Sequence, residues 1–349
     1  MTLRALEPRD LLSTFELPDE LIATGPPEAR SLARDEVKLL VAAGGRLSDH
    51  TFADLAHILE PGDLLVVNNS QTLPAAVVVD ERRIVHFSTS LPGGLRVVEM
   101  RYRDRGGTKP ALDLEPGVVG LPGGARLELL APYPVDTATR RLWVAHVESR
   151  IPLEDYLRSN GRAISYSNSN ETWPLEAYQT VFARIPGSAE MPSAARPFSA
   201  RLVTSLVAKG VGVAPITLHT GVSSLEIGED PYAEWFEVPA ATSELIMATR
   251  VRGDRVVAVG TTVVRALASV TDDTGGVRPG AGWTDLVVGP DSRLPMIDGL
   301  ITGWHEPSSS HLDILRAFTR PDMLDECYSH ALAKGYLWHE FGDSHLILR

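Results

Sequence analysis

Residues 255–269, Arg-Val-Val-Ala-Val-Gly-Thr-Thr-Val-Val-Arg-Ala-Leu-Ala-Ser, constrain the fold of this chain more than any other stretch. The apolar run 256–259 predicts a buried strand, Gly260 a hinge, and residues 261–270 a helix. A buried strand that passes through a glycine into a helix is typical of α/β architecture.

The start of this expected helix has two interpretations. The hydroxyl groups of Thr261 and Thr262 can cap free backbone N–H groups, which would be a structural role. The same N–H groups, together with the helix dipole, can also hold an anion such as a carboxylate. Arg265 follows one turn later, where its guanidinium group could bind that anion as well.

The rest of the chain divides into two kinds of sequence. Residues 1–69 and 151–349 contain both helical and strand patterns, as an α/β domain does. Residues 70–150 instead carry short apolar strands separated by turns, which predicts an inserted antiparallel β domain. In the α/β part, strands are expected at 35–42, 64–68, 211–218, 256–259 and 286–288. Helices are expected at 51–59, 199–209, 242–251, 261–270, 308–319 and 322–334, and a glycine-rich loop at 272–282. In the insertion, strands are expected at 76–79, 83–87, 95–100 and 142–147, with Pro-Gly-Gly turns at 92–94 and 122–124.

The charge of the chain is uneven. The formal net charge of −12 argues against a general nucleic-acid-binding protein, because phosphate contacts supply most of such affinity. Residues 70–150 hold 11 Lys and Arg against 9 Asp and Glu, so the insertion is slightly basic. Its basic residues form either a solvated face or a patch that contacts RNA; they are Arg101, Arg103, Arg105, Lys109, Arg140 and Arg141.

Several function classes find no support in the sequence. The single cysteine, Cys327, favours a small buried residue in a reducing compartment. The N-terminus lacks the apolar core of a signal peptide, and no apolar run approaches the roughly 20 residues that cross a bilayer, so a cytoplasmic protein without membrane contact is expected. His305 and His311 lie six residues apart without a recognisable metal motif, and no metal is expected. Dinucleotide-binding, Walker and nucleophile-elbow motifs are also absent.

Polar residues that follow or precede expected strands are candidate site residues, because ligands of α/β proteins gather at strand ends. His219 follows the strand 211–218, and His305 lies between two expected elements. Asp285 precedes an expected strand, and Asp298 lies in a turn with Gly299. Each of these four residues can equally be structural.

Further strings, taken with residues 255–269, resemble the S-adenosylmethionine:tRNA ribosyltransferase-isomerases of queuosine biosynthesis. They lie in the order of that family at 15–22, 59–68, 178–183 with 186–188, 217–221, 282–285, 297–302 and 341–343. The resemblance implies a discontinuous, barrel-like α/β main domain with an inserted antiparallel β-barrel domain.

The resemblance also implies a reaction. In the family, S-adenosylmethionine donates its ribosyl part to the aminomethyl group of a 7-deazaguanine in tRNA, which gives epoxyqueuosine. The carbon next to the sulfonium must lose a proton to a general base, and adenine and methionine leave. The implied partners are S-adenosylmethionine and a tRNA that carries the 7-aminomethyl-7-deazaguanine precursor, and a monomer or weak dimer is expected.

On this basis, the site residues receive expected roles. Thr261, Thr262 and Arg265 are expected to hold an anionic group of S-adenosylmethionine. His219 or His305 is the candidate proton carrier, because imidazole titrates near neutrality. Asp285 and Asp298 are expected to orient ribose hydroxyls. Two residues of the matching string 178–183 complete the expected cofactor site, Tyr178 and Gln179.

The sequence departs from the family pattern at basic positions. Pro197 stands where the family has a histidine, Ser308 where it has a lysine, and the string 68–71 lacks an acid and an arginine. Arg196, next to Pro197, is a candidate replacement. Three hypotheses therefore stand: the family's reaction on tRNA, a divergent S-adenosylmethionine-using enzyme with another acceptor, and a non-catalytic binding protein of the same fold.

Overall fold

The computed structural model describes residues 15–104, 107–134, 140–165, 173–222, 232–307 and 309–349. Its α-helices are α1 (Leu55–Ile58), α2 (Leu153–Asn160), α3 (Ala200–Lys209), α4 (Ala240–Arg252), α5 (Thr261–Ala268), α6 (His311–Arg316) and α7 (Pro321–Ala333). Short 3₁₀ turns lie at Asp19–Leu21, Pro27–Arg30, Arg34–Glu36, Phe52–Asp54, Pro92–Gly94, Pro122–Gly124, Leu175–Tyr178 and Ser193–Ala195.

The strands form two large sheets and one small sheet. Those outside the insertion are β1 (Lys38–Ala43), β2 (Arg46–Thr51), β3 (Leu64–Asn68), β4 (Ser70–Thr72), β13 (Ile185–Ser188), β14 (Gly212–Leu218), β15 (Glu234–Val238), β16 (Val256–Val259), β17 (Gly280–Thr284), β18 (Gly299–Gly303) and β19 (Ser344–Leu348). Those of the insertion and its return are β5 (Ala76–Val78), β6 (Arg83–Ser90), β7 (Leu95–Asp104), β8 (Gly107–Pro110), β9 (Gly117–Gly120), β10 (Arg126–Tyr133), β11 (Leu142–Glu148) and β12 (Gly161–Arg162).

The main sheet has a parallel centre and antiparallel edges. Its described strands follow the order β17-β15-β14-β3-β16-β18-β19-β1-β2. The four strands β14, β3, β16 and β18 run parallel, whereas β19 runs antiparallel to β18 and parallel to β1. The central strands are apolar on both faces, as expected for strands covered on both sides.

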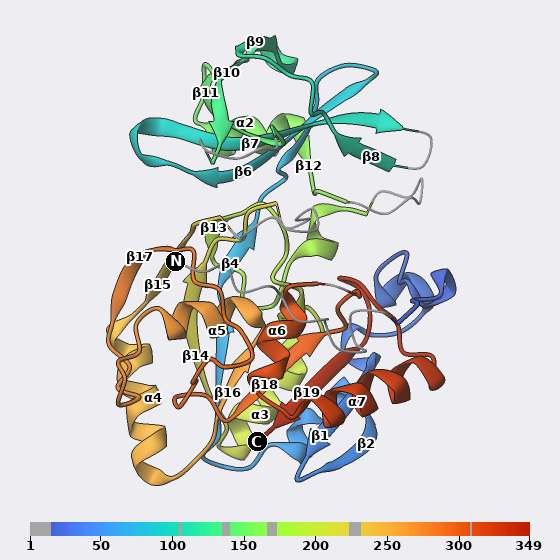
Figure 1. Ribbon diagram of the computed structural model, residues 1–349, viewed down its shortest axis with the longest axis vertical. Coiled ribbons are helices and arrows are strands. Elements are labelled where there is room, and N and C mark those ends of the chain that lie inside the picture. Colours follow the sequence, from blue (N-terminus) through green and yellow to red (C-terminus); the bar gives the residue numbers. More distant parts are fainter. Residues whose placement is uncertain (1–14, 105–106, 135–139, 166–172, 223–231, 308) are drawn as a thin grey trace, which may run out of the picture.

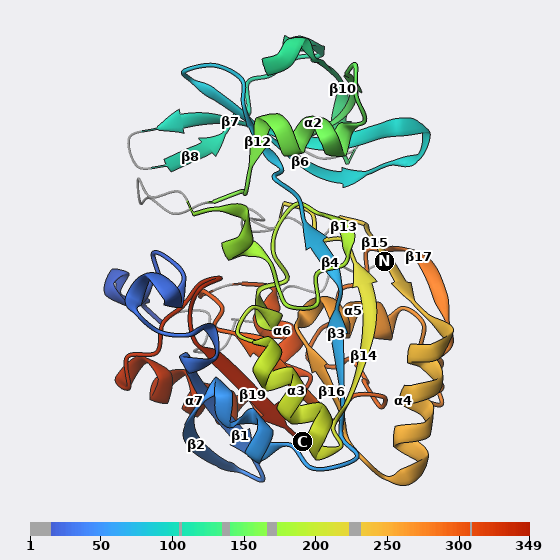
Figure 2. The ribbon, with the colours of Figure 1, turned by 180° about the vertical axis from the view of Figure 1, so that it is seen from behind.

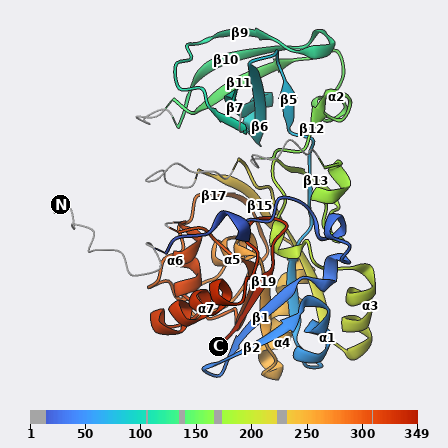
Figure 3. The ribbon, with the colours of Figure 1, turned by 90° about the vertical axis from the view of Figure 1, so that its right-hand side faces the viewer.

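Helices cover both faces of the main sheet (Figures 2 and 3). Because successive side chains of a strand point to opposite faces, Leu64 and Val66 pack in one core with α4 to α7, whereas Leu65 and Val67 pack in another with α1 and α3. The second core includes α3, whose N-terminus is capped by the Ser199 hydroxyl accepting from the Leu202 N–H at 3.1 Å. This three-layer arrangement leaves the ends of the strands free to carry a site.

The antiparallel sheet of the insertion lies beyond one end of the main sheet (Figure 1). Its described strands follow the order β12-β5-β6-β7-β11-β10-β9, and β8 pairs with β7. One hydrophobic core serves this sheet and includes Tyr156 and Leu157 of α2, which follow residue 150. The entry strand β5 and the return strand β12 pair with each other. The division of the chain at residues 70 and 150 stays a prediction.

Most of the expected elements are present, and the mixed α/β architecture is confirmed. The strand expected at 286–288 is wrong. The strand that pairs with β15 is β17, which lies earlier in the chain and begins inside the stretch 272–282 that was expected to be a loop. The sequence also did not predict β2, β15, β18 or β19. Neither sheet closes into a barrel along its described strands. Among the described residues, every helix is too short or too polar to span a bilayer.

A buried ion cluster fixes the centre of the inserted sheet. Glu99 on β7 is fully buried and lies 2.6 Å from the Arg101 guanidinium and 3.2 Å from that of Arg141. Burial alone would raise the pKa of Glu99, but His86, whose Nδ1 lies 3.7 Å from the carboxylate, and the charge of Arg101 lower it. Arg101 and Arg141 therefore do not form part of an exposed RNA-binding patch, and Arg105 lies outside the described residues.

The Glu99 cluster predicts a large stability effect. Glu99→Ala would leave two buried guanidinium groups without their shared carboxylate, and we expect the free energy of unfolding to fall by about 3–5 kcal/mol. Urea denaturation followed by circular dichroism measures this loss. Glu128→Ala, which removes an exposed carboxylate from β10 of the same sheet, is the matched control and is expected to change stability by less than about 0.5 kcal/mol. Equal stabilities of the two variants would contradict the prediction.

Candidate functional site

The site lies at the carboxyl ends of the parallel strands, on the edge of the main sheet that faces the insertion (Figures 1 and 2). Asn68, the last residue of β3, joins these ends. Its amide group donates to the Leu218 carbonyl at 2.8 Å and accepts from the Leu218 N–H at 3.1 Å, so it ties β3 to the end of β14. It also lies 3.4 Å from the hydroxyl of Thr262, which brings α5 to the same point.

His219 directly follows β14 and lies at this edge. Its Nδ1 is 2.7 Å from the Ser70 hydroxyl, which in turn is 2.6 Å from the Ser188 hydroxyl. The imidazole stacks on Trp235 with 5.2 Å between ring centroids. A Cβ at Gly187 would lie 2.4 Å from the imidazole, so glycine is required at that position. The ring is thus held in one orientation.

Burial, with a further contribution from the charge of Arg96, lowers the pKa of His219 to about 4. The imidazole is therefore neutral at pH 7 and able to accept a proton. Arg96 belongs to β7, so the insertion contributes to the electrostatics of the site. Ser88 of the insertion also accepts a hydrogen bond from the Val222 N–H at 3.1 Å and lies 3.2 Å from the Tyr232 hydroxyl.

The junction between β16 and α5 has the expected hinge but not the expected cap. Gly260 has a φ of +94°, a conformation that favours glycine, and is itself the N-cap of α5. No side chain caps the helix, so the structural capping role considered for Thr261 and Thr262 is wrong. The N–H groups of these two residues make no hydrogen bond to any residue that the structure describes.

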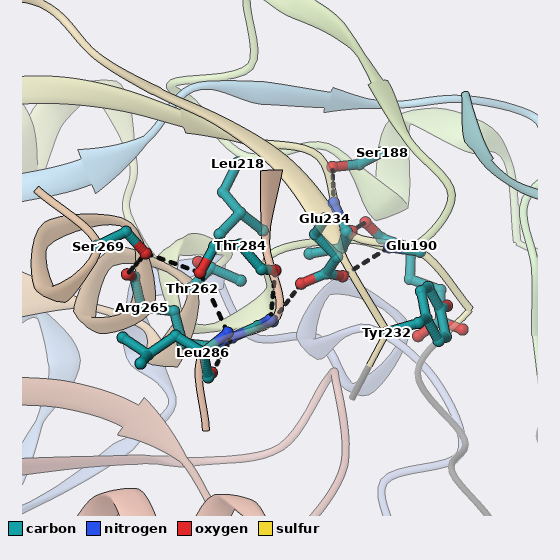
Figure 4. Close-up of polar contacts among 12 residues, drawn as sticks. Ser188, Glu190, Leu218, Tyr232, Glu234, Thr262, Arg265, Ser269, Thr284 and Leu286 are labelled. Atoms are coloured by element: carbon teal, nitrogen blue, oxygen red, sulfur yellow. Dashed lines mark hydrogen bonds and ion pairs between the residues drawn. The ribbon is translucent and has the colours of Figure 1, made fainter. Parts of the chain in front are cut away.

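Arg265 is held by protein groups (Figure 4). Its guanidinium forms an ion pair with Glu234 and donates to the carbonyls of Thr284 at 3.1 Å and Leu286 at 3.2 Å. The other carboxylate oxygen of Glu234 accepts from the Gly221 N–H at 2.8 Å. Arg265 therefore fixes the segment that follows His219, and its expected contact with an anion stays a prediction.

His305 lies at the end of β18 in a second group of histidines. Its Nε2 is 2.8 Å from the Thr302 hydroxyl, and its ring stacks on His311 with centroids 4.7 Å apart. Burial, followed by the proximity of His311, lowers the pKa of His305 well below its usual value. Burial and the charge of Arg265 lower the pKa of His311 to about 4.

His345 on β19 completes this group. It is fully buried and stacks on Trp304 with centroids 4.8 Å apart. Neither of its ring nitrogens finds a hydrogen-bond partner among the described residues. Burial lowers its pKa to about 3. Three histidines therefore lie near one another in uncharged form, and no three His, Cys, Asp or Glu side chains of the described ranges form a metal site.

Tyr178 and Gln179 lie at the same edge but face different neighbours. Tyr178 is buried and packs against Phe341, with ring centroids 5.1 Å apart. Gln179 hydrogen-bonds both backbone groups of Thr72, donating to its carbonyl at 2.8 Å and accepting from its N–H at 3.2 Å. Gln179 thereby bonds the last residue of β4, just before the chain enters the insertion.

The two expected aspartates are not brought together. Asp285 is exposed next to β17 and is close enough to Tyr133 of the insertion to raise the pKa of that phenol, behind the larger effect of burial. Asp298 precedes β18 and accepts from the Val256 N–H at 2.9 Å. Because β16 and β18 are parallel, Asp298 lies at their amino ends, opposite His219. Its partners there favour a structural role.

Several residues of this edge were not predicted from the sequence. Glu234 carried a signal, because it opens the alternating run Glu-Trp-Phe-Glu-Val, where a carboxylate on the buried face needs a cationic partner. Ser70 and His345 carried no comparable signal, because the residues that they contact in the folded protein, such as His219 and Trp304, lie far from them in the sequence. The candidate replacement Arg196 is buried and bonds Glu28 at 2.8 Å and the Ala177 carbonyl at 3.1 Å. Ser308 lies outside the described residues.

Comparisons with known proteins agree with one another. A family model described as queuosine biosynthesis protein matches residues 12–347. The S-adenosylmethionine:tRNA ribosyltransferase-isomerase of Symbiobacterium thermophilum is 35% identical over 96% of this chain and 98% of its own length. The protein of the same description from Acidithiobacillus ferrooxidans is 36% identical over 95% of this chain and 96% of its own length. The crystal structure of S-adenosylmethionine tRNA ribosyltransferase from Thermotoga maritima is similar with a TM-score of 0.54 at 26% identity, covering 97% of this chain and all of that one.

The buried histidines predict a loss of stability in acid. His219, His311 and His345 have pKa values of about 4, 4 and 3 in the folded protein, below the ordinary value of 6.5. Below pH 6.5 the unfolded chain therefore binds protons that the folded chain does not. The free energy of unfolding is expected to fall as the pH decreases from 6.5 towards 3.

His345→Phe keeps the ring stack on Trp304 and removes one of these groups, so its stability is expected to fall less steeply between pH 6.5 and 5. Urea denaturation at several pH values measures the slope. His57→Gln, at an exposed position, serves as control and is expected to keep the wild-type slope. A His345→Phe variant with the wild-type slope would refute the assignment.

Proposed function

The chain belongs to the queuosine biosynthesis protein family, and from this premise we propose that it is an S-adenosylmethionine:tRNA ribosyltransferase-isomerase. The observation that carries the proposal is the near-complete coverage: relatives of that description align with 95–96% of this chain, a span that includes the strand ends of the site and the insertion. The proposed acceptor is tRNA that carries 7-aminomethyl-7-deazaguanine, and the proposed donor is S-adenosylmethionine.

In this proposal His219 is the general base. The reaction needs a base for the proton on the carbon next to the sulfonium, and a neutral imidazole is in the form that accepts it. The Ser70 hydroxyl occupies Nδ1, so Nε2 is the nitrogen that exchanges the proton. The charge of Arg96 acts on His219, so both the insertion and the main sheet contribute to the surroundings of the proposed base.

The start of α5 is the proposed seat for the carboxylate of the methionine part. The N–H groups of Thr261 and Thr262 point out of the first turn without partners among the described residues, and the helix dipole favours an anion there. Arg265 contributes indirectly, since it holds Glu234 and through it Gly221. His305 remains the second candidate proton carrier, and Tyr178 remains a candidate cofactor-binding residue.

A second candidate is an S-adenosylmethionine-using enzyme with a different acceptor. It is favoured by the net charge of −12 and by the burial of Arg101 and Arg141, which reduce the basic surface offered to RNA. The two candidates differ in one observable property, the dependence of turnover on tRNA.

Titration of S-adenosylmethionine into the purified protein, followed by assay of adenine and methionine release with and without precursor-carrying tRNA, tests the proposal. We expect binding in both cases and release only with that tRNA. The matched control is the same tRNA with unmodified guanine at the modified position. Release that does not depend on the precursor would favour the second candidate, and absence of binding by folded protein would refute both.

The proposed base predicts a specific kinetic effect. His219→Gln is expected to lower kcat about 10²- to 10⁴-fold, because this is the usual contribution of a general base, and to change the Kd of S-adenosylmethionine only slightly. Single-turnover assays and calorimetry measure the two quantities. The control is His146→Gln, an exposed position on β11. A His219→Gln variant with wild-type kcat would exclude His219 as the base.

A further inference from the structure

An open sheet face lies beside His219. The strands β14, β15 and β17 form an antiparallel edge of the main sheet, and β17 is the outermost of its described strands on that side (Figure 1). One face of this edge packs into the core, for example through Phe236 of β15. On the other face, Pro215, Glu237 and Ala281 are exposed. This second face is therefore accessible to a partner.

A row of three rings crosses the open face. The His219 N–H donates to the Trp235 carbonyl at 2.9 Å, and Trp235 lies opposite Trp283 in the register of β15 and β17. Residues directly opposite each other in an antiparallel pair point to the same face, with Cβ atoms about 5 Å apart. The imidazole stacks on the indole of Trp235, whereas Trp283 is 41% exposed. The row therefore leads from the proposed base to the outer edge of the sheet.

The charges around this row favour an uncharged aromatic partner. Glu237 is exposed on the same face as Trp235, and Asp285 is exposed two residues after Trp283. These two carboxylates repel phosphate groups. The cation that acts on His219 belongs to the inserted sheet and lies at the inner end of the row; it is Arg96. The outer end is thus suited to the face of a nucleobase rather than to the sugar-phosphate backbone.

We propose that Trp283 is a stacking surface for a base of the acceptor tRNA, next to the base that reacts at His219. This inference rests on the proposed function and names the part of the tRNA that the open face contacts. An enzyme that does chemistry on a base takes that base out of its stack, and the neighbouring bases lose their partner. Aromatic side chains on an antiparallel sheet supply such a partner in RNA-binding proteins.

The position of Trp283 fits a neighbouring nucleotide. Strands of a sheet lie about 4.8 Å apart, so Trp283, two strands from the end of β14, lies about 10 Å from His219. The adenine of S-adenosylmethionine is a planar ring as well. Small ligands, however, are bound in concave sites that enclose most of their surface, whereas Trp283 lies on an open edge strand. The open edge therefore favours a base of the larger substrate.

Steady-state kinetics with precursor-carrying tRNA test the inference. Trp283→Ala is expected to raise the KM for that tRNA about 5- to 150-fold, the usual effect of removing one stacked ring. The kcat at saturating tRNA and the Kd of S-adenosylmethionine are expected to keep their wild-type values, because Trp283 contacts neither the reacting atoms nor the donor. Trp283→Phe keeps a ring face and is expected to restore most of the affinity. Leu245→Ala, which shortens a similarly exposed apolar side chain on α4, is the matched control.

The salt dependence of tRNA binding separates stacking from phosphate contact. Loss of a phosphate contact reduces the slope of log affinity against log salt concentration, whereas loss of a stacked ring lowers the affinity by the same factor at each salt concentration. Titrations at several salt concentrations are therefore expected to give parallel lines for the wild-type protein and Trp283→Ala. A smaller slope for Trp283→Ala would overturn the stacking assignment.

Other outcomes would overturn the inference in different ways. A wild-type KM in Trp283→Ala would overturn it and leave the proposed function standing. A raised Kd of S-adenosylmethionine with an unchanged KM for tRNA would overturn it in favour of the donor's adenine. A changed sedimentation coefficient with an unchanged KM would overturn it in favour of contact between copies of this chain. A wild-type protein without tRNA-dependent turnover would overturn the proposed function and this inference together.

Discussion

The ion pair between Arg265 and Glu234 is the interaction on which the rest of the candidate site depends. Arg265 lies in α5 after β16, and Glu234 opens β15 at the other side of β14. Through the Gly221 N–H and the carbonyls of Thr284 and Leu286, this one pair connects the loop after His219 with β15, β17 and α5. Loss of Glu234 would leave the poorly solvated guanidinium of Arg265, whose charge acts on His311, without its carboxylate, and loss of either partner would free the loop.

The centre of the fold could be predicted from sequence because its physical signal is local. β3 and β16 are buried on both faces, so each reads as a continuous apolar run, and glycines mark where the chain turns. The edge strands gave no such signal. β2 reads Arg-Leu-Ser-Asp-His-Thr and is mostly exposed, so its pairing with β1 is decided by tertiary contact rather than by hydrophobic pattern. β17 was missed for a similar reason, since Gly-Ala-Gly-Trp-Thr resembles a loop until β15 lies beside it.

The sequence predicted where the candidate site lies better than it predicted which side chains contact one another there. His219 and Gly260 lie at strand ends, and strand ends follow from local pattern. Their partners do not: Ser70 lies 149 residues from His219, and no spacing rule connects them. The role expected for Asp298 is not supported, for a different reason. A turn aspartate next to a strand looks the same in sequence at either end of that strand, and only the direction of β18 places it away from the site.

The pairing of β5 with β12 has a consequence for how the chain folds. The neighbouring strands β3 and β14 of the main sheet pair in parallel, for example Leu64 with Gly212, across the whole insertion. Closing so long a loop carries an entropic cost and slows folding. Because the two ends of the insertion lie side by side once its own sheet has formed, the effective loop between β3 and β14 shortens sharply. Formation of the inserted sheet thereby brings the two halves of the central sheet closer together.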